Sequence, residues 1–193
     1  MHADKVDKDI HGNEFVIAPD GSTTFGQITD KCGLKAAPIK LCEGIITNDE
    51  TKEGYGLVHI EARHGDEIRE AGYTSVEEFV QFVAENYDEN DIKVGKKNKK
   101  GGTTYLLQVK KTHNYTLFIE LSSDETYWNI NSGGVFNARY GKKRESVKPA
   151  SAQQDGESVL DNTLRPVTEA DNKTRPNGNV SDTSSVDKDT ENP

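Results

Sequence analysis

The chain runs out of core-forming side chains well before it ends. Ile130 is the last isoleucine and Tyr140 the last aromatic residue in a sequence of 193 residues. Residues 146–193 are mostly Ser, Thr, Asn, Asp and Glu, and they hold four of the six prolines. A segment of this kind buries too little apolar surface to offset the entropy lost on ordering. We therefore predict a disordered acidic tail over residues 146–193.

The part of the chain before this tail is long enough for one small domain. We expect that domain over residues 25–145, preceded by an extension, residues 1–24. The extension can form a small hairpin, because residues 14–19 end in a Pro-Asp-Gly turn signal and a new apolar run follows. The sequence has no run of about 18 apolar residues and no apolar stretch of a signal peptide near its start. We therefore expect no membrane partner.

Charge is unevenly distributed along the chain. In total, 24 Lys and Arg stand against 33 Asp and Glu, a net charge of −9. Residues 43–91 hold fourteen acids and three bases, whereas residues 92–111 hold seven lysines and no acid. Residues 139–148 add five bases against one acid. The basic half is either a solvated lysine-rich loop or an edge that attracts phosphate, and the sequence leaves both interpretations open.

Apolar spacing predicts two helices in the first half of the domain. Over residues 55–72 apolar side chains recur at helical intervals, and His64 fills the missing position of the stripe. Thr74 or Ser75 can cap a second helix, because a glutamate follows three residues later. An apolar face then continues to Tyr87.

The hydrophobic period becomes that of strands after residue 91. Runs rich in β-branched and aromatic residues are joined by short links, which favours antiparallel pairing. Pro38 interrupts residues 34–41, where we expect an extended or irregular segment, and residues 132–134 (Ser-Gly-Gly) are typical of a turn. The predicted fold class is α+β, with two N-terminal helices packed on a four-stranded antiparallel β-meander. The predicted strands are residues 91–95, 103–111, 115–121 and 126–131.

The densest group of chemically active side chains is residues 59–64 (HIEARH). On a helix, His59 and Arg63 share a face and His64 points toward the apolar stripe. On a strand, His59, Glu61 and Arg63 share a side instead. In both cases a histidine and an arginine can converge on an anion. Imidazole suits acid–base chemistry near neutral pH, and guanidinium binds phosphate in a fork.

A structural interpretation of these side chains stays open. His64 can be a partly buried histidine of the core, and His59 with Arg63 can be an ordinary surface pair. The spacing of the two histidines lacks the metal-binding H-E-x-x-H geometry, and the two cysteines have no recognised ligand spacing. We therefore expect no metal site and no cofactor.

A second group of polar side chains lies in residues 126–134. In a strand, Tyr127, Asn129 and Asn131 lie on one face and can hydrogen-bond a base or a phosphate. The backbone of the Ser-Gly-Gly segment can offer N–H groups to an anion. The alternative is a half-exposed edge strand that ends in a tight turn. The candidate substrate-binding residues are Lys110, Asn129, Asn131 and Ser132.

Several blocks of the sequence resemble one known family. Residues 54–68 (GYGLVHIEARHGDEI), followed by TTYLLQV, LFIELS and YWNINSGGVF, are similar to the phage-associated branch of the barnase–EndoU–colicin–RelE-like nuclease superfamily. These domains occur in phage and mobile-element proteins, often as one module of a polyvalent protein. The resemblance covers about residues 25–140. It implies an α+β nuclease fold and a metal-independent ribonuclease whose catalytic residues are His59, Arg63, His64 and Thr126.

The resulting hypothesis is an endoribonuclease that needs no metal. One histidine deprotonates the ribose 2′-OH and the other protonates the leaving oxygen, while Arg63 and Lys110 stabilise the charge on phosphorus. RNA is then the substrate, and an immunity protein or another phage protein a partner. The expected location is the cytoplasm of a bacterial host or a phage particle. The alternatives are a non-catalytic binding module of a phage protein, with structural histidines, and a structural component of a virion.

Overall fold

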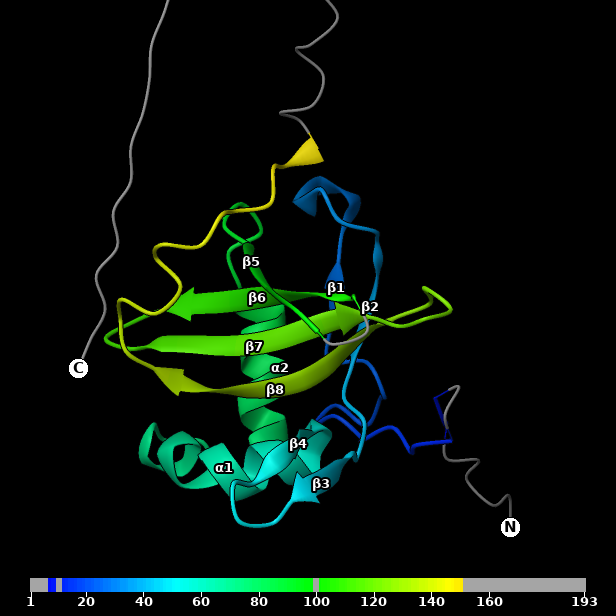
Figure 1. Ribbon diagram of the computed structural model, residues 1–193, viewed down its shortest axis with the longest axis vertical. Helices are drawn as coiled ribbons and strands as arrows, with labels where there is room; N and C mark the ends of the chain where they lie inside the picture. Colours follow the sequence, from blue (N-terminus) through cyan, green and yellow to red (C-terminus); the bar gives the residue numbers. More distant parts are fainter. Residues whose placement is uncertain (1–6, 10–11, 99–100, 151–193) are drawn as a thin grey trace, which may run out of the picture. The chain divides into compact units, whose positions relative to one another are not determined.

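A computed structural model of the protein describes residues 7–9, 12–98 and 101–150 (Figure 1). The predicted tail therefore lies, from residue 151 onward, outside the described residues. Within the described part, no helix has the length and apolar character needed to cross a membrane. The elements, in chain order, are β1 (Gly26–Ile28), the 3-10 helix η1 (Asp30–Cys32), β2 (Ala37–Lys40), β3 (Ile45–Asn48), β4 (Glu53–Tyr55), α1 (Gly56–Glu70), α2 (Val76–Asn86), β5 (Lys93–Lys97), β6 (Thr103–Lys110), β7 (Asn114–Leu121) and β8 (Trp128–Phe136).

The predicted fold class was wrong about the sheet. The domain is α+β, but its sheet has six strands in the order β1-β2-β8-β7-β6-β5, and it is mixed rather than a four-stranded antiparallel meander. Strand β2 pairs parallel to β8 through Ile39 and Lys40, and β1 pairs antiparallel to β2. A separate two-stranded sheet is formed by β3 and β4. Two strands of the main sheet, β1 and β2, therefore precede the helices in the chain and extend this sheet beyond β8.

Strand β2 is the element that the sequence pattern hid. Pro38 has no N–H to donate, which argues against an interior strand. In the structure Pro38 is paired only toward β1, and the contact with β8 begins one residue later, at Ile39. Pro38 therefore lies at a position where pairing with β8 requires no N–H donor.

The core lies between the sheet and α2. Helix α2 begins where predicted, since the Ser75 side chain accepts a hydrogen bond from the Glu78 N–H at 3.2 Å. Its apolar face is fully buried against one side of the sheet. The buried residues of this interface include Val76, Phe79, Val80 and Val83 from the helix, and Leu107, Leu117, Ile119 and Ile130 from the strands.

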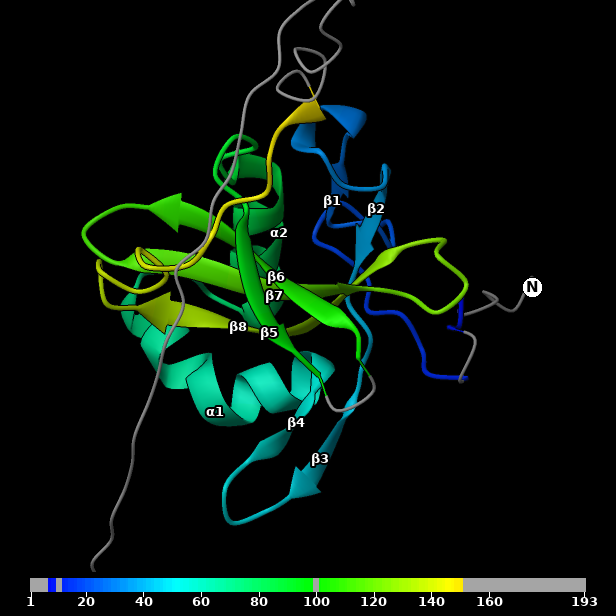
Figure 2. The ribbon, with the colours of Figure 1, turned by 45° about the horizontal axis from the view of Figure 1, so that its top comes forward.

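Helix α1 lies along an edge of the sheet rather than across its face (Figures 1 and 2). Strand β2 pairs with β8 only at Trp128 and Asn129. Beyond those two residues β8 has no second strand partner among the described residues, and α1 runs beside it. Ile60 and Ile68 of α1 are completely buried in the core. The other faces of the helix can therefore hold polar side chains beside β8.

A bulge in β8 decides which way its later side chains point. Phe118 of β7 pairs with Ser132, but the next residue, Ile119, pairs with Ile130, so that Asn131 is an extra residue in β8. The predicted turn at residues 132–134 was wrong, because these residues continue β8. A bulge reverses the alternation of side chains beyond it. Ser132 therefore shares the face of Phe118, opposite the face that α2 covers, which we call the open face.

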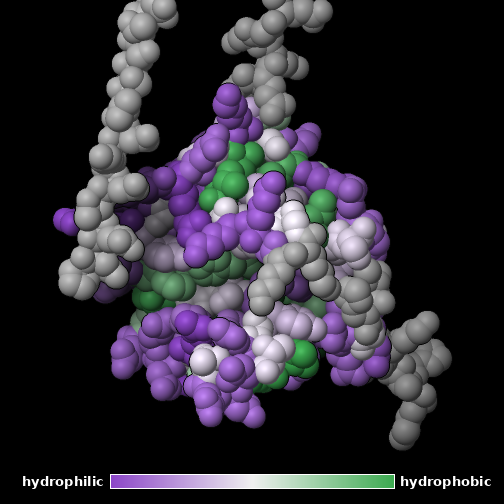
Figure 3. All heavy atoms as spheres, in the orientation of Figure 1, coloured by the Kyte–Doolittle hydropathy of each residue, from purple (hydrophilic) through white to green (hydrophobic). Residues whose placement is uncertain are grey.

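The chain leaves β8 and folds back across the open face as a strap, residues 137–147. The side-chain amide of Asn114 donates to the Tyr140 carbonyl oxygen at 2.9 Å. Further on, the Val94 N–H donates to the Glu145 carbonyl at 2.7 Å, and the Val147 N–H to the Ile92 carbonyl at 2.8 Å. Figure 3 shows the open face as a recessed band of hydrophobic colour between the hydrophilic surface of α1 and the hydrophilic surface above it.

Candidate functional site

A buried histidine is held at both ring nitrogens where α1 meets β8. The turn between β3 and β4 brings the Lys52 carbonyl oxygen to 2.7 Å from His59 Nδ1. Lys52 has φ 54°, which is uncommon for a residue other than glycine. A carbonyl oxygen can only accept, so Nδ1 carries the proton and Nε2 carries the lone pair. The small sheet thus fixes the tautomer of His59.

The lone pair of His59 faces a hydroxyl group. His59 Nε2 lies 3.1 Å from Ser132 Oγ, and the Ser132 hydroxyl donates to it. The bulge at Asn131 makes this contact available, because it turns Ser132 toward the open face. Hydroxyl, imidazole and a fixed carbonyl in this order form a hydroxyl–base–orienting group arrangement.

Burial keeps His59 neutral. His59 is only 6% exposed. Its removal from water lowers its pKa below the usual 6.5, and this effect outweighs the hydrogen bond with the Lys52 carbonyl, which raises the pKa. The positive charges that His64 and Arg63 can carry lower the pKa of His59 further. A neutral imidazole that accepts from a hydroxyl at Nε2 is able to take up that proton at neutral pH.

The second histidine lies beside the first and has a charged partner. The rings of His59 and His64 are 6.3 Å apart and nearly perpendicular. His64 Nδ1 lies 2.5 Å from Glu67 Oε1, so that the carboxylate orients this ring. The same carboxylate oxygen also accepts from the Val135 N–H of β8 at 3.4 Å. The two histidines therefore differ: His59 has neutral oxygen partners and His64 an acidic one.

A glycine of β8 makes room for this pair. A Cβ atom at Gly134 would lie 2.7 Å from Glu67 Oε1 and 2.8 Å from His64 Nδ1. Such contacts are shorter than side chains allow, so the histidine–carboxylate pair fits against β8 only because residue 134 has no side chain. The Phe136 ring closes the other side, 5.6 Å from the ring of His64.

The sequence-predicted site residues fall into two groups. His59, His64 and Ser132 come together as described above. Arg63 is exposed on α1 next to His64, and its charge acts on His59. Thr126 lies elsewhere: it lines a separate pocket of about 280 Å³ with Lys40 and Asp124, before β8 begins. From Trp128 to Ser132 alone, β8 spans about 13 Å, so Thr126 does not reach the histidines.

Lys110 lies at the end of β6, on the side of β7 away from β8, where it already has a partner. It forms an ion pair with Asp91, which also binds Lys93 at 2.5 Å and accepts from Ser146 Oγ at 2.8 Å. Burial works to raise the pKa of Asp91, but the hydrogen bonds from these three residues outweigh it and lower that pKa to about 2. Lys110 thus belongs to a structural cluster two strands away from β8.

The two asparagines face β7 rather than the histidines. Asn129 Nδ2 donates to Asn131 Oδ1 at 2.7 Å, and Asn131 Nδ2 donates to Glu120 Oε2 at 3.1 Å. Glu120 also accepts from Asn98. Their donors are committed within this network, and only Asn129 Oδ1 is buried without a partner among the described residues.

Three features of the site could not be identified from residue type and spacing. Glu67 is one of three glutamates of α1 that residue type does not distinguish, and the Lys52 carbonyl belongs to the backbone. The strap was visible only as a basic stretch, residues 139–148, without its relation to the histidines.

In the described part of the chain no group of three or more His, Cys, Asp or Glu could hold a metal ion.

The chain matches no protein-family model, no curated protein and no solved structure. The resemblance to phage-associated nucleases therefore stays a prediction.

Proposed function

We propose that the protein is an endoribonuclease that cleaves RNA by histidine acid–base chemistry without a metal. The observation that carries the proposal is the pairing of two unlike histidines on α1: the Nε2 lone pair of His59 accepts from a hydroxyl group, and His64 is paired with a carboxylate. An unlike pair of this kind supplies both the base and the acid of a phosphodiester cleavage.

The cleavage begins at the ribose 2′-OH of the substrate. This hydroxyl passes its proton to Ser132 Oγ as the Ser132 proton moves to His59 Nε2. The 2′ oxygen attacks the adjacent phosphorus, and the bond from phosphorus to the 5′ oxygen breaks. His64 acts in its doubly protonated form, with Nδ1–H on Glu67, and gives its Nε2 proton to that leaving oxygen, so that the products carry a 2′,3′-cyclic phosphate and a 5′-OH. Arg63, exposed beside His64, stabilises the negative charge that develops on phosphorus.

A cleavage assay on mixed RNA tests the proposal. We expect fragments with 2′,3′-cyclic ends, formed equally with EDTA and with added Mg²⁺. His64→Ala should lower kcat by about 10²–10⁴-fold, the usual contribution of a general acid. His113, exposed in the turn between β6 and β7, is the matched control, and His113→Ala should leave cleavage unchanged. Intact RNA at high protein concentration, or equal rates for the two variants, would overturn the proposal.

A non-catalytic binding module of a phage or mobile-element protein is the second candidate. Its support is that His59 is buried with both ring nitrogens bonded inside the protein, as in a purely structural histidine. In that case no RNA is cut, and His59→Ala lowers stability without changing any activity.

A further inference from the structure

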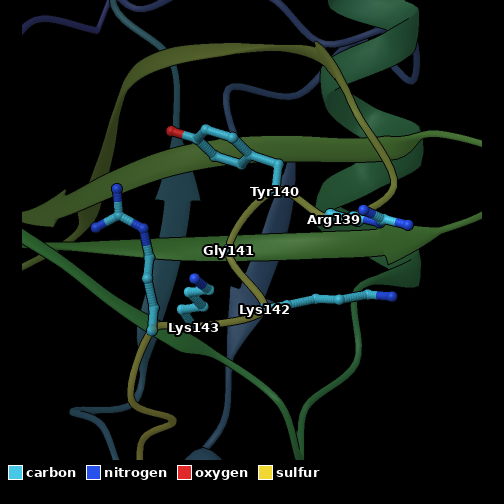
Figure 4. Close-up of a pocket in the computed structure, with 6 residues that line it drawn as sticks. Arg139, Tyr140, Gly141, Lys142 and Lys143 are labelled. Carbon is cyan, nitrogen blue, oxygen red and sulfur yellow. The ribbon is translucent and has the colours of Figure 1, made fainter.

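A cluster of positive side chains lies on the strap. Arg139, Lys142, Lys143 and Arg144, together with Tyr140 and Gly141, line a hollow of about 590 Å³ (Figure 4). Among the residues that the structure describes, none of these four cations takes part in an ion pair. In a chain of net charge −9, four neighbouring cations without acidic partners are a place where an anion is attracted.

The cations lie on a segment that is anchored to the sheet by hydrogen bonds. Tyr140 accepts hydrogen bonds at its carbonyl oxygen from Asn114 at 2.9 Å and from Gln108 at 3.4 Å, both buried in the sheet. Gly141 has φ 81°, which lets the chain turn sharply at the hollow. In Figure 4 the side chains of Arg139 and Lys142 extend from this turn in the same direction. A segment anchored in this way loses little further freedom when a ligand binds.

A row of aromatic rings joins the hollow to the histidines. Tyr140 stacks on Phe136, with ring centres 4.5 Å apart and an angle of 22°. Phe118 meets both rings edge-on. The guanidinium of Arg144 lies 5.9 Å from the centre of the Tyr140 ring, and on the other side Phe136 lies 5.6 Å from His64. The row of rings therefore extends without a gap from Arg144 to His64, the proposed general acid.

We propose that the strap binds an unpaired stretch of the RNA substrate. Phosphates lie on the four cations, and a base stacks on the face of Tyr140 that Phe136 does not cover, on the side of Arg144. The neighbouring phosphate then reaches His59 and His64. Aromatic and guanidinium planes stack on bases only where these are not paired. The occupant is therefore single-stranded RNA rather than a duplex. The identity of the ligand as RNA rests on the proposed function, whereas the hollow and its charges do not.

Binding can be measured apart from cleavage with an RNA that cannot be cut. The probe is a fluorescent single-stranded 2′-O-methyl RNA of about ten nucleotides, whose attacking hydroxyl is blocked, and the protein is the full chain. We expect anisotropy to show binding at low salt, and the same sequence as a duplex to bind at least tenfold more weakly. Absence of binding, or equal affinity for the duplex, would overturn the inference.

Variants of the strap locate the binding. Lys142→Gln with Lys143→Gln should reduce the slope of log affinity against log salt by about 1.4, the value for two lost phosphate contacts on a single strand. The control is Lys96→Gln with Lys97→Gln, an exposed lysine pair at the end of β5, which should leave the slope unchanged. Equal slopes for the two double variants would contradict the assignment.

Substitution of the tyrosine tests stacking separately from charge. Tyr140→Ala should weaken binding by about 5–150-fold, the usual effect of losing one stacked base, whereas Tyr140→Phe should retain it. Thermal melting of both variants confirms that they are folded. Binding without any RNA cleavage by the unmodified protein defeats the proposed function alone. Cleavage with no effect of the strap variants on binding defeats this inference alone.

Discussion

His59 is neutral in the folded protein and takes up a proton more easily in the unfolded chain. Its pKa in the fold is lowered, chiefly by burial, whereas in the unfolded chain it returns to the usual value of 6.5. Above that value both states are neutral and pH has no effect through His59. As pH falls below it, the unfolded state takes up a proton that the folded state resists, so stability is lost toward acid.

The stability of the protein should therefore depend on His59 below pH 6.5. We expect the free energy of unfolding of the wild type to fall, relative to His59→Gln, by up to about 1.4 kcal/mol per pH unit. Glutamine does not titrate and retains an amide donor for the Lys52 carbonyl. Urea unfolding of both proteins between neutral and mildly acidic pH measures the difference. The other histidines are present in both proteins, so parallel curves would mean that His59 is not neutral in the fold.

Residue type was sufficient to find the histidines but not their partners. His59 and His64 stand out because few side chains ionise near neutral pH. Glu67 differs from Glu61 and Glu70 only by its position opposite Gly134, a contact between elements distant in sequence. Thr126 and Lys110 were assigned by motif and charge, and the structure places both away from the histidines because neither lies on the part of β8 beside α1.

At the scale of elements, two adjacent glycines of β8 serve different purposes. A Cβ at Gly133 would lie 2.7 Å from Leu117 Cδ2 in the core, whereas one at Gly134 would meet the His64–Glu67 pair. Both glycines lie within the strand, on opposite faces. One glycine therefore permits packing of the core, and the other permits assembly of the site.

Alanine at each of these positions should separate stability from activity. Gly133→Ala overpacks the core and should lower the free energy of unfolding by about 1–3 kcal/mol. Gly134→Ala should displace His64 and lower kcat by about 10²-fold, with a smaller loss of stability because the Glu67 side chain can move. Thermal melting and the RNA assay on both variants give the comparison. Unchanged cleavage by Gly134→Ala would show that the position of His64 is unimportant.

The sequence revealed the elements that are strongly periodic and missed those that depend on pairing. Both helices lie where apolar spacing and the capping glutamate predicted them. Strand β2 was hidden by Pro38, since a short strand with a proline has no periodic signal of its own. The bulge at Asn131 exists only in the register of β8 with β7. This register places Ser132 on the open face, whereas simple alternation placed it with Ile130.

At the scale of the whole molecule, the chain is acidic while its proposed RNA surface is basic. Residues 151–193 contain nine acids and four bases, so this segment repels RNA through long-range charge. A protein that ends at residue 150 should bind the 2′-O-methyl RNA about tenfold more tightly at low salt, with no difference at high salt. Anisotropy titrations of both lengths measure the effect. A full-length variant with five of the nine acids replaced by amides, which leaves this segment without net charge, is the control and should match the shortened protein. Equal affinities of the full and shortened proteins at low salt would contradict the prediction.

The position of α1 beside β8 has a consequence for how the protein behaves when damaged. An exposed strand edge is a template on which another chain can add a strand. Beyond Asn129, α1 covers this edge, and Glu67 accepts from the Val135 N–H there. The helix that carries both histidines thus also shields the protein from self-association. Substitutions that detach α1 should produce aggregates together with the loss of activity, so inactive variants of this helix are best judged after their oligomeric state is known.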